Sequence, residues 1–269
     1  MEAQNIPAFQ VEDYMPPQNE MKFRVDFQYS EEQFQSDPAK FWKERGKKLN
    51  GETEKFGGKG KAIEQVVAQI VSASDAPEVK AQKLYARVQQ LRNYSYEVQK
   101  TEQEQKRDKT KGARNAEDVW RNGGGEGWEL TWLYLALTKA AGIEAYPVFV
   151  STRNEYIFQP KAMNARQLNS NVVMLKLDGK PVYCDPGSAL APYGLLPWGE
   201  TGVVGLKLDK DGGSWVETVE ANGNVLRYTR TLEVKEPSVP LSKVNELKNL
   251  YRAIAGDERN TAVLKSSQQ

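Results

Sequence analysis

The chain has 269 residues, 39% of them hydrophobic, with 37 basic and 36 acidic side chains. A net charge of +1 offers no general attraction for nucleic acid or an anionic membrane, and no apolar run approaches the ~20 residues that a spanning helix needs. One cysteine, Cys184, and no histidine exclude an intrachain disulfide, histidine-dependent triads and zinc held by thiolates or imidazoles. We therefore expect no metal, no cofactor, no nucleic-acid partner and no membrane insertion.

The first 114 residues predict a strand, three helices and a short extended segment before a polar loop. Phe23, Val25 and Phe27 alternate as in a strand, and Ser36 and Pro38 are helix-start signals. Apolar residues at helical spacing predict two further helices. We assign the strand to 21–30, the helices to 36–49, 61–73 and 77–94, a short strand or extended exit to 94–98 and the loop to 99–114. Asp75 and Glu78 resemble a capping box for the third helix.

A short capped helix is predicted over 115–122, and a glycine-rich loop, Gly123 to Gly127, follows it. Apolar residues from Leu130 onward predict a helix buried on much of its circumference, with Gly142 as its C-terminal cap. The spacing of apolar residues then changes to the alternation of strands, and Asp178-Gly179 predicts a hairpin turn. We assign strands to 144–152, 171–177 and 180–186, further short strands to 203–233 and a final helix to 241–260. Helices followed by antiparallel strands indicate the α+β class.

The glycine-rich loop lacks the features of a nucleotide site. Leu130 stands where a dinucleotide fingerprint needs its third glycine, and the loop contains no lysine for a phosphate-binding loop. Glu126 and Glu129 at the helix start suit the helix dipole but would repel a phosphate. The unpaired main-chain N–H groups of the first helical turn could still bind an anionic or carbonyl group of a ligand.

Three separated motifs resemble a known family: the glycine loop with its apolar helix, "AAGIEAYPVFVST", and "VYCDPGS". They resemble the transglutaminase-like core, a papain-type α+β fold in bacterial multidomain proteins. The resemblance implies helices packed on an antiparallel sheet, with a C-terminal β extension and helix. It also implies a cysteine at the helix start, a histidine opening a strand and an aspartate before a proline. These positions fall on Gly127, on Asn171 (Ser170 is the alternative) and on Asp185.

The resemblance also suggests the domain organisation. Residues 1–35 resemble the linker and strand that end a preceding β-sandwich, 36–200 form the core, and 201–269 form the β extension and terminal helix. The chain thus resembles an excerpt or a shortened member of a longer protein. The first ten residues show no signal peptide, although members of the family commonly carry one, which implies a secreted or periplasmic location.

Two of the three catalytic positions are replaced, since glycine offers no nucleophile and asparagine accepts no proton at neutral pH. The resemblance therefore implies a pseudoenzyme that binds a peptide or glycan or supports contacts between domains. The candidate binding residues in the old cleft are Glu126, Trp128, Glu129, Asn169, Ser170, Tyr193 and Trp198. For the aromatic residues, the structural alternative is a place in the core.

Two other chemistries remain open at this point. Cys184 could replace the nucleophile, but we expect a buried strand residue, because free cysteines are mostly buried. Glu126, Glu129 and Asp185 could form the carboxylate cluster of a hydrolase. The structural alternative is that the two glutamates stabilise the helix start and that Asp185 caps a turn.

Overall fold

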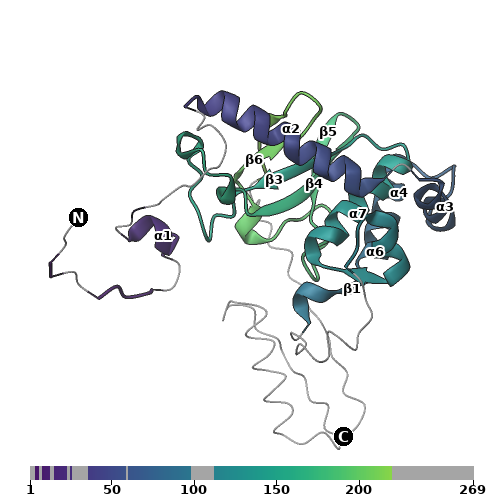
Figure 1. Ribbon diagram of the computed structural model, residues 1–269. Coiled ribbons are helices and arrows are strands. Elements are labelled where there is room, and N and C mark those ends of the chain that lie inside the picture. The colour runs from purple at the N-terminus through teal and green to yellow at the C-terminus, as the bar shows by residue number, and fades with distance from the viewer. Residues whose placement is uncertain are drawn as a thin grey trace, which may run out of the picture. The chain divides into compact units, whose positions relative to one another are not determined.

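The computed structural model describes residues 4–5, 8–12, 15–22, 25, 36–58, 60–97 and 112–219, all within one compact unit, residues 1–221 (Figure 1). Its α-helices are α1 (Gln18–Met21), α2 (Pro38–Gly57), α3 (Lys61–Ile70), α4 (Pro77–Val88), α6 (Ala116–Asn122) and α7 (Gly127–Ala140). Most of the strand predicted over 21–30, nearly all of the loop 99–114 and the helix predicted over 241–260 lie outside the described residues. Within these ranges no helix is long and apolar enough to cross a membrane.

The strands form a small parallel pair and one antiparallel sheet. The pair is β1 (Arg92–Asn93) with β2 (Gly124–Gly125). The five-stranded sheet has the order β5-β4-β3-β6-β7. Its members are β3 (Ala145–Val150), β4 (Ser170–Leu177), β5 (Lys180–Cys184), β6 (Val204–Lys207) and β7 (Ser214–Glu217). The predicted α+β class is confirmed. Strands β6 and β7, which lie in the predicted C-terminal extension after residue 200, belong to the same sheet as β3 to β5.

The predicted hairpin joins β4 and β5. Asp178 and Gly179 have φ values of 48° and 77°, which a two-residue turn between twisted strands requires. The turn sets the register in which Leu177 lies opposite Lys180 and Val173 opposite Cys184. Cys184 therefore points to the same face of the sheet as Val173. The next residue, Asp185, leaves the strand at the edge where β4 begins.

Helix α7 forms the centre of the core. Its side chains pack with those of α3, α4 and α6 and with Val173 and Leu175 of β4. Neighbours on so many sides explain why the helix is apolar around most of its circumference. The helix ends as predicted: the N–H of Gly142 (φ 80°) donates to Lys139 O, and that of Ile143 donates to Thr138 O. This pair of bonds satisfies the last carbonyl groups of the helix.

Helix α2 lies on the same face of the sheet as α7 (Figure 1). Trp42 and Leu49 of α2 pack on Leu206 of β6, and Phe149 of β3 contacts both this group and Trp132 of α7. The Trp42 indole N–H also donates to Pro160 O at 2.8 Å. The opposite face of the sheet has a separate apolar cluster, formed by Val148, Val150, Val172, Met174, Tyr183 and Val203.

Several local predictions needed correction. Asp37, not Ser36, caps α2, because its carboxylate accepts the Ala39 N–H at 2.9 Å. The capping box predicted for α4 is wrong: Ala76 is the cap residue, and the Asp75 carboxylate accepts from Ser72 N–H and Lys83 Nζ. The segment predicted as a short strand or extended exit at 94–98 begins with a 3-10 turn, Tyr94–Tyr96. The short capped helix is confirmed as α6, where Asn115 accepts from Asp118 N–H.

The start of α2 provides a direct test of this capping assignment. We expect Asp37→Ala to lower the free energy of unfolding by about 1 kcal/mol, because a main-chain N–H of the first turn loses its acceptor. The neighbouring Ser36→Ala is the matched control, with a change within about 0.5 kcal/mol. Chemical denaturation measures both. Equal effects of the two substitutions would contradict the assignment.

Candidate functional site

The start of helix α7 is capped by side chains of the chain itself. The Ser95 hydroxyl accepts the Gly127 N–H at 2.9 Å and donates to Glu126 Oε2 at 2.8 Å. Glu129 Oε2 accepts the Glu126 N–H at 2.8 Å. The expectation that these helix-start N–H groups bind a ligand is therefore wrong for Glu126 and Gly127. The structural alternative for the two glutamates, stabilisation of the helix start, is what the hydrogen bonds show.

Gly127 touches the main chain of Gly187, two residues after Asp185. A Cβ added at Gly127 would lie 2.9 Å from Gly187 O and 3.5 Å from Ser95 Oγ. A Cβ added at Gly187 would lie 2.3 Å from Gly127 O and 2.6 Å from Thr131 Oγ1. Asn93 Nδ2 holds the Gly187 carbonyl with a hydrogen bond of 2.7 Å. The space in which a nucleophilic side chain at position 127 would begin is thus occupied by backbone.

Asp185 anchors the turn 185–188 that carries Gly187. The residue is 4% exposed, and its Oδ1 accepts from Gly187 N–H at 3.0 Å and from Thr131 Oγ1 at 3.2 Å. Burial raises the pKa of this carboxyl, although hydrogen bonds from Ser188, Gly187 and Thr131 oppose the shift. Asp185 therefore ties the turn to α7, as the structural alternative for this residue proposed.

Asn171, at the predicted histidine position, takes no part in this network. It lies on β4 opposite Phe149, on the same face as Val173 and Leu175, and so faces α7. Its Nδ2 is buried and has no hydrogen-bond partner among the described residues. Asn171 and Asp185 lie at the same end of the paired strands β4 and β5. The Asp185 carboxylate nevertheless bonds to Thr131 and Gly187 rather than to Asn171.

Glu200 is a functional candidate that the sequence did not reveal. It ends the 3-10 turn Trp198–Glu200, is 4% exposed, and accepts from Ser170 Oγ at 2.5 Å. Its other oxygen, Oε2, is buried without a partner among the described residues. Burial, and then the charge of Asp185, raise the pKa of Glu200 to about 8. Only the tertiary structure brings it beside Ser170, since its Pro-Trp-Gly-Glu context has the composition of an exposed turn.

The cleft candidates divide into exposed and internally bonded side chains. Trp128 is 44% exposed with its ring against Phe56 and Trp132, and Trp198 is 63% exposed beneath the Arg153 guanidinium. Tyr193 instead packs against the core, with its ring on Tyr85. Asn169 accepts from Thr152 N–H and donates to Thr152 Oγ1 and Glu155 Oε2, which fixes the loop. Only the two tryptophans among these present a broad aromatic surface to solvent.

Cys184 is a structural residue. Its side chain is 0% exposed and belongs to the core beneath α7. Burial raises the pKa of the thiol to about 12, so the thiolate is not populated at neutral pH. The prediction of a buried strand cysteine is confirmed, and a nucleophilic role at this position has no support in the structure.

The carboxylates proposed for a hydrolase are each engaged in local hydrogen bonds. Glu126 accepts from Ser95, Glu129 from the Glu126 N–H, and Asp185 from Thr131 and Gly187. Burial raises the pKa of Glu129, and the hydrogen bond from Glu126 opposes the shift. In the described ranges, no group of three or more Cys, Asp or Glu side chains is placed to hold a metal ion.

The contact between Gly127 and Gly187 predicts that alanine at position 127 lowers the stability of the fold. Gly127→Ala should lower the free energy of unfolding by about 1–3 kcal/mol, because its Cβ would overlap a fixed carbonyl. Gly51→Ala in the interior of α2 is the control, since a Cβ there meets nothing within 4 Å. It should stabilise the chain by about 0.5–1 kcal/mol through helix propensity. A Gly127→Ala variant as stable as Gly51→Ala would show that the contact is absent.

The buried carboxyl of Glu200 predicts an inverted pH dependence. Between its unfolded value of 4.5 and its folded pKa of about 8, the folded chain holds a proton that the unfolded chain has lost. The free energy of unfolding should therefore fall as pH rises across this window, by at most about 1.4 kcal/mol per pH unit. Denaturant titrations at several pH values should show a flatter curve for Glu200→Gln. An unchanged slope in that variant would assign the dependence to other groups.

Comparisons with known proteins include a likeness to a solved structure. No protein-family model matches the chain, and no curated protein sequence matches it. The chain is similar to the crystal structure of a putative protease from Parabacteroides distasonis, with 15% sequence identity and a TM-score of 0.48. The match covers 66% of this chain and 31% of that protein's chain. The transglutaminase-like assignment is therefore a proposal that rests on the motifs around Gly127, Asn171 and Asp185.

Proposed function

We propose that the chain is a transglutaminase-like, papain-type domain that has lost catalysis and acts by binding a peptide or glycan or by supporting contacts between domains. One observation carries the proposal: the main chain of Gly187 lies against Gly127, the position that presents the thiol in the family. Thiol chemistry needs a sulfur atom at this point and a base to activate it. Gly127 supplies no side chain, and a Cβ there would lie 2.9 Å from Gly187 O, so the neighbouring backbone would have to shift.

The remaining positions support the same conclusion. The Asn171 amide cannot accept a proton at neutral pH, and the Asp185 carboxylate is bonded to Thr131 and Gly187. Cys184, the one thiol of the chain, is buried and protonated. In coupled catalytic groups, loss of a single member removes most of the rate enhancement. Binding through exposed aromatic rings, with Trp128 beside the old nucleophile position, needs none of these groups.

A second candidate function is favoured by the contact between Ser95 and Glu126. The Ser95 hydroxyl lies on the exposed surface beside position 127 and donates to the Glu126 carboxylate at 2.8 Å. A hydrolase could use Ser95 as nucleophile, with the carboxylate accepting its proton. The Oγ atom also accepts the Gly127 N–H, which is the bond of an ordinary helix cap. Capping therefore explains the same geometry without catalysis.

Turnover assays separate these functions. The purified chain should show neither amine incorporation into a glutamine-containing protein nor peptidase activity, and a fluorophosphonate probe should leave Ser95 unlabelled. Loss of measurable turnover in Ser95→Ala would establish the serine hydrolase instead, and loss in Glu129→Gln or Asp185→Asn would establish the carboxylate cluster. Turnover abolished by Cys184→Ala would refute the inactive-domain proposal. Thermal denaturation of each variant confirms that the chain still folds.

A further inference from the structure

Trp198 presents the most exposed indole ring of the chain. It is 63% exposed, against 44% for Trp128 and 42% for Trp215, and the other three tryptophans are less exposed than these. Trp128 and Trp215 pack against other aromatic rings, whereas Trp198 has no aromatic partner among the described residues. Its ring contacts the Arg153 guanidinium, whose carbon lies 5.3 Å from the ring centroid. Most of the surface of Trp198 is therefore open to solvent.

The turn that carries Trp198 is firmly held. A single exposed apolar side chain is common and carries no meaning by itself. Here, however, Thr201 Oγ1 donates to Trp198 O at 2.9 Å, and the Arg153 N–H donates to Gly199 O at 2.8 Å. Glu200, the last residue of the turn, is 4% exposed and anchors the turn in the interior. A ligand that binds the ring therefore does not have to order the main chain beneath it.

A free carboxamide lies beside this turn. A Cβ added at Gly199 would lie 2.6 Å from Asn154 Oδ1, so the lack of a side chain at Gly199 lets the carboxamide come close. Asn154 is exposed, and its side chain forms no hydrogen bond with another residue in the described part of the chain. Asn169 fixes the loop that carries it, through hydrogen bonds with Thr152 and Glu155. The two donors and the acceptor of the carboxamide are thus available to a ligand.

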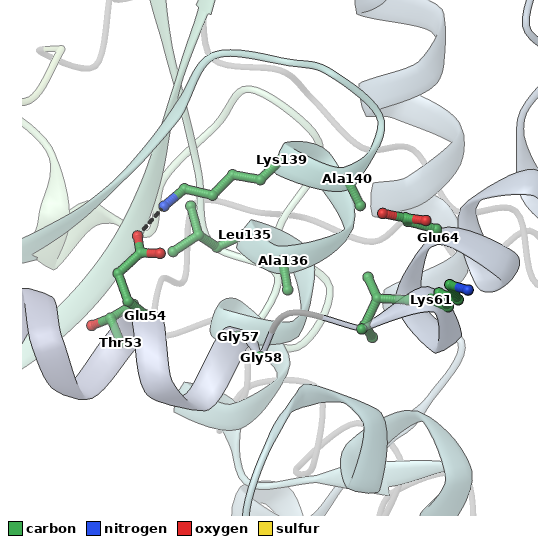
Figure 2. A pocket seen from close by; sticks show the side chains of 12 residues that line it. Thr53, Glu54, Gly57, Gly58, Lys61, Glu64, Leu135, Ala136, Lys139 and Ala140 are labelled. Carbon is green, nitrogen blue, oxygen red and sulfur yellow. Dashed lines mark hydrogen bonds and ion pairs between the residues drawn. The ribbon is translucent and has the colours of Figure 1, made fainter.

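An indole ring beside a free carboxamide suits a sugar. A hexopyranose has an apolar face of C–H groups that can pack on the indole, and hydroxyl groups at its rim that can bond to a carboxamide. Peptides are recognised mainly at sheet edges or in apolar grooves. Trp198 and Asn154 lie outside the edge strands, which are β5 and β7. They also lie outside the pocket in Figure 2, which is lined by α2, α3, α7 and the link between α2 and α3.

We propose that Trp198 and Asn154 bind one sugar ring of an oligosaccharide. The C–H face of the sugar stacks on the indole, and a hydroxyl group bonds to the Asn154 carboxamide. The inference rests on the proposed function, because it names the ligand class of a domain that acts by binding. It places the sugar at Trp198 and not at Trp128, which lies beside the old nucleophile position.

Ligand-detected NMR with cellohexaose tests the proposal. The hydroxyl groups of its β-linked glucose rings are equatorial, so both faces of each ring offer C–H groups to an indole. Because one sugar ring meets one indole, binding should appear at about 1–10 mM sugar, with saturation transfer to the sugar C–H protons. Absence of sugar binding at about 10 mM would overturn the proposal, whether or not a capped tetra-alanine peptide binds.

Variants locate the binding to this surface. Trp198→Ala should weaken cellohexaose binding by about tenfold or more, because the stacking surface is lost. Asn154→Ala removes the carboxamide and Gly199→Ala displaces it, so each should weaken binding by about two- to fivefold. Trp215→Phe is the matched control, since this exposed tryptophan lies on β7, and it should leave binding unchanged. Undiminished binding in a folded Trp198→Ala variant, or loss in Trp128→Phe alone, would place the sugar elsewhere and contradict the inference.

This inference and the proposed function fail on different results. Turnover that is abolished by Cys184→Ala would refute the inactive-domain proposal and leave sugar binding at Trp198 intact. Absence of cellohexaose binding would overturn the sugar site and leave an inactive domain that binds a peptide or supports contacts between domains.

Discussion

The close approach of two main-chain segments, at Gly127 and Gly187, is the constraint on which the candidate site depends. A Cβ at either position would overlap a carbonyl oxygen of the other segment. Asn93 holds the Gly187 carbonyl, and the Asp185 carboxylate holds the Gly187 N–H. Because both polar groups of Gly187 are bonded, the turn is held against the start of α7 by several weak interactions acting together.

The same region contains a dense set of hydrogen bonds around the start of α7. At the start of α7, Ser95 accepts the Gly127 N–H and Glu129 accepts the Glu126 N–H. The carboxylates nearby also accept hydrogen bonds: Glu126 from Ser95, and Asp185 from Thr131 and Gly187. Asp185 and Glu200 are buried, and burial raises the pKa of both carboxyl groups.

Features set by local sequence were predictable. The apolar spacing of α7, the glycine that ends it and the Asp178-Gly179 turn each depend on residues within a few positions, and all three appear in the structure. The alternation of apolar and polar residues in β3 to β5, after a series of helices, likewise predicted the α+β class. The predicted capping box of α4 was wrong because the Asp75 carboxylate accepts hydrogen bonds from other neighbours, Ser72 and Lys83, and does not cap the helix.

Features that depend on distant contacts were not predictable. Ser95 caps a helix that starts 32 residues later, and Gly187 contacts Gly127, which lies far from it in the sequence. Glu200 becomes buried because its turn folds onto Ser170, 30 residues earlier in the chain. Sequence motifs pointed to Gly127, Asn171 and Asp185, but they could not show that the main chain of Gly187 lies against Gly127.

The reactivity of a thiol introduced at position 127 tests this account most directly. Alkylation of a Gly127→Cys, Asn171→His variant can be followed against pH by mass spectrometry, with buried Cys184 as the internal unreactive reference. The account predicts a thiol at position 127 with a pKa no lower than the ordinary value of about 8.5, and no amine incorporation. A thiol that reacts rapidly below pH 7, together with measurable transamidation, would show that the site is open and needs only its missing side chains.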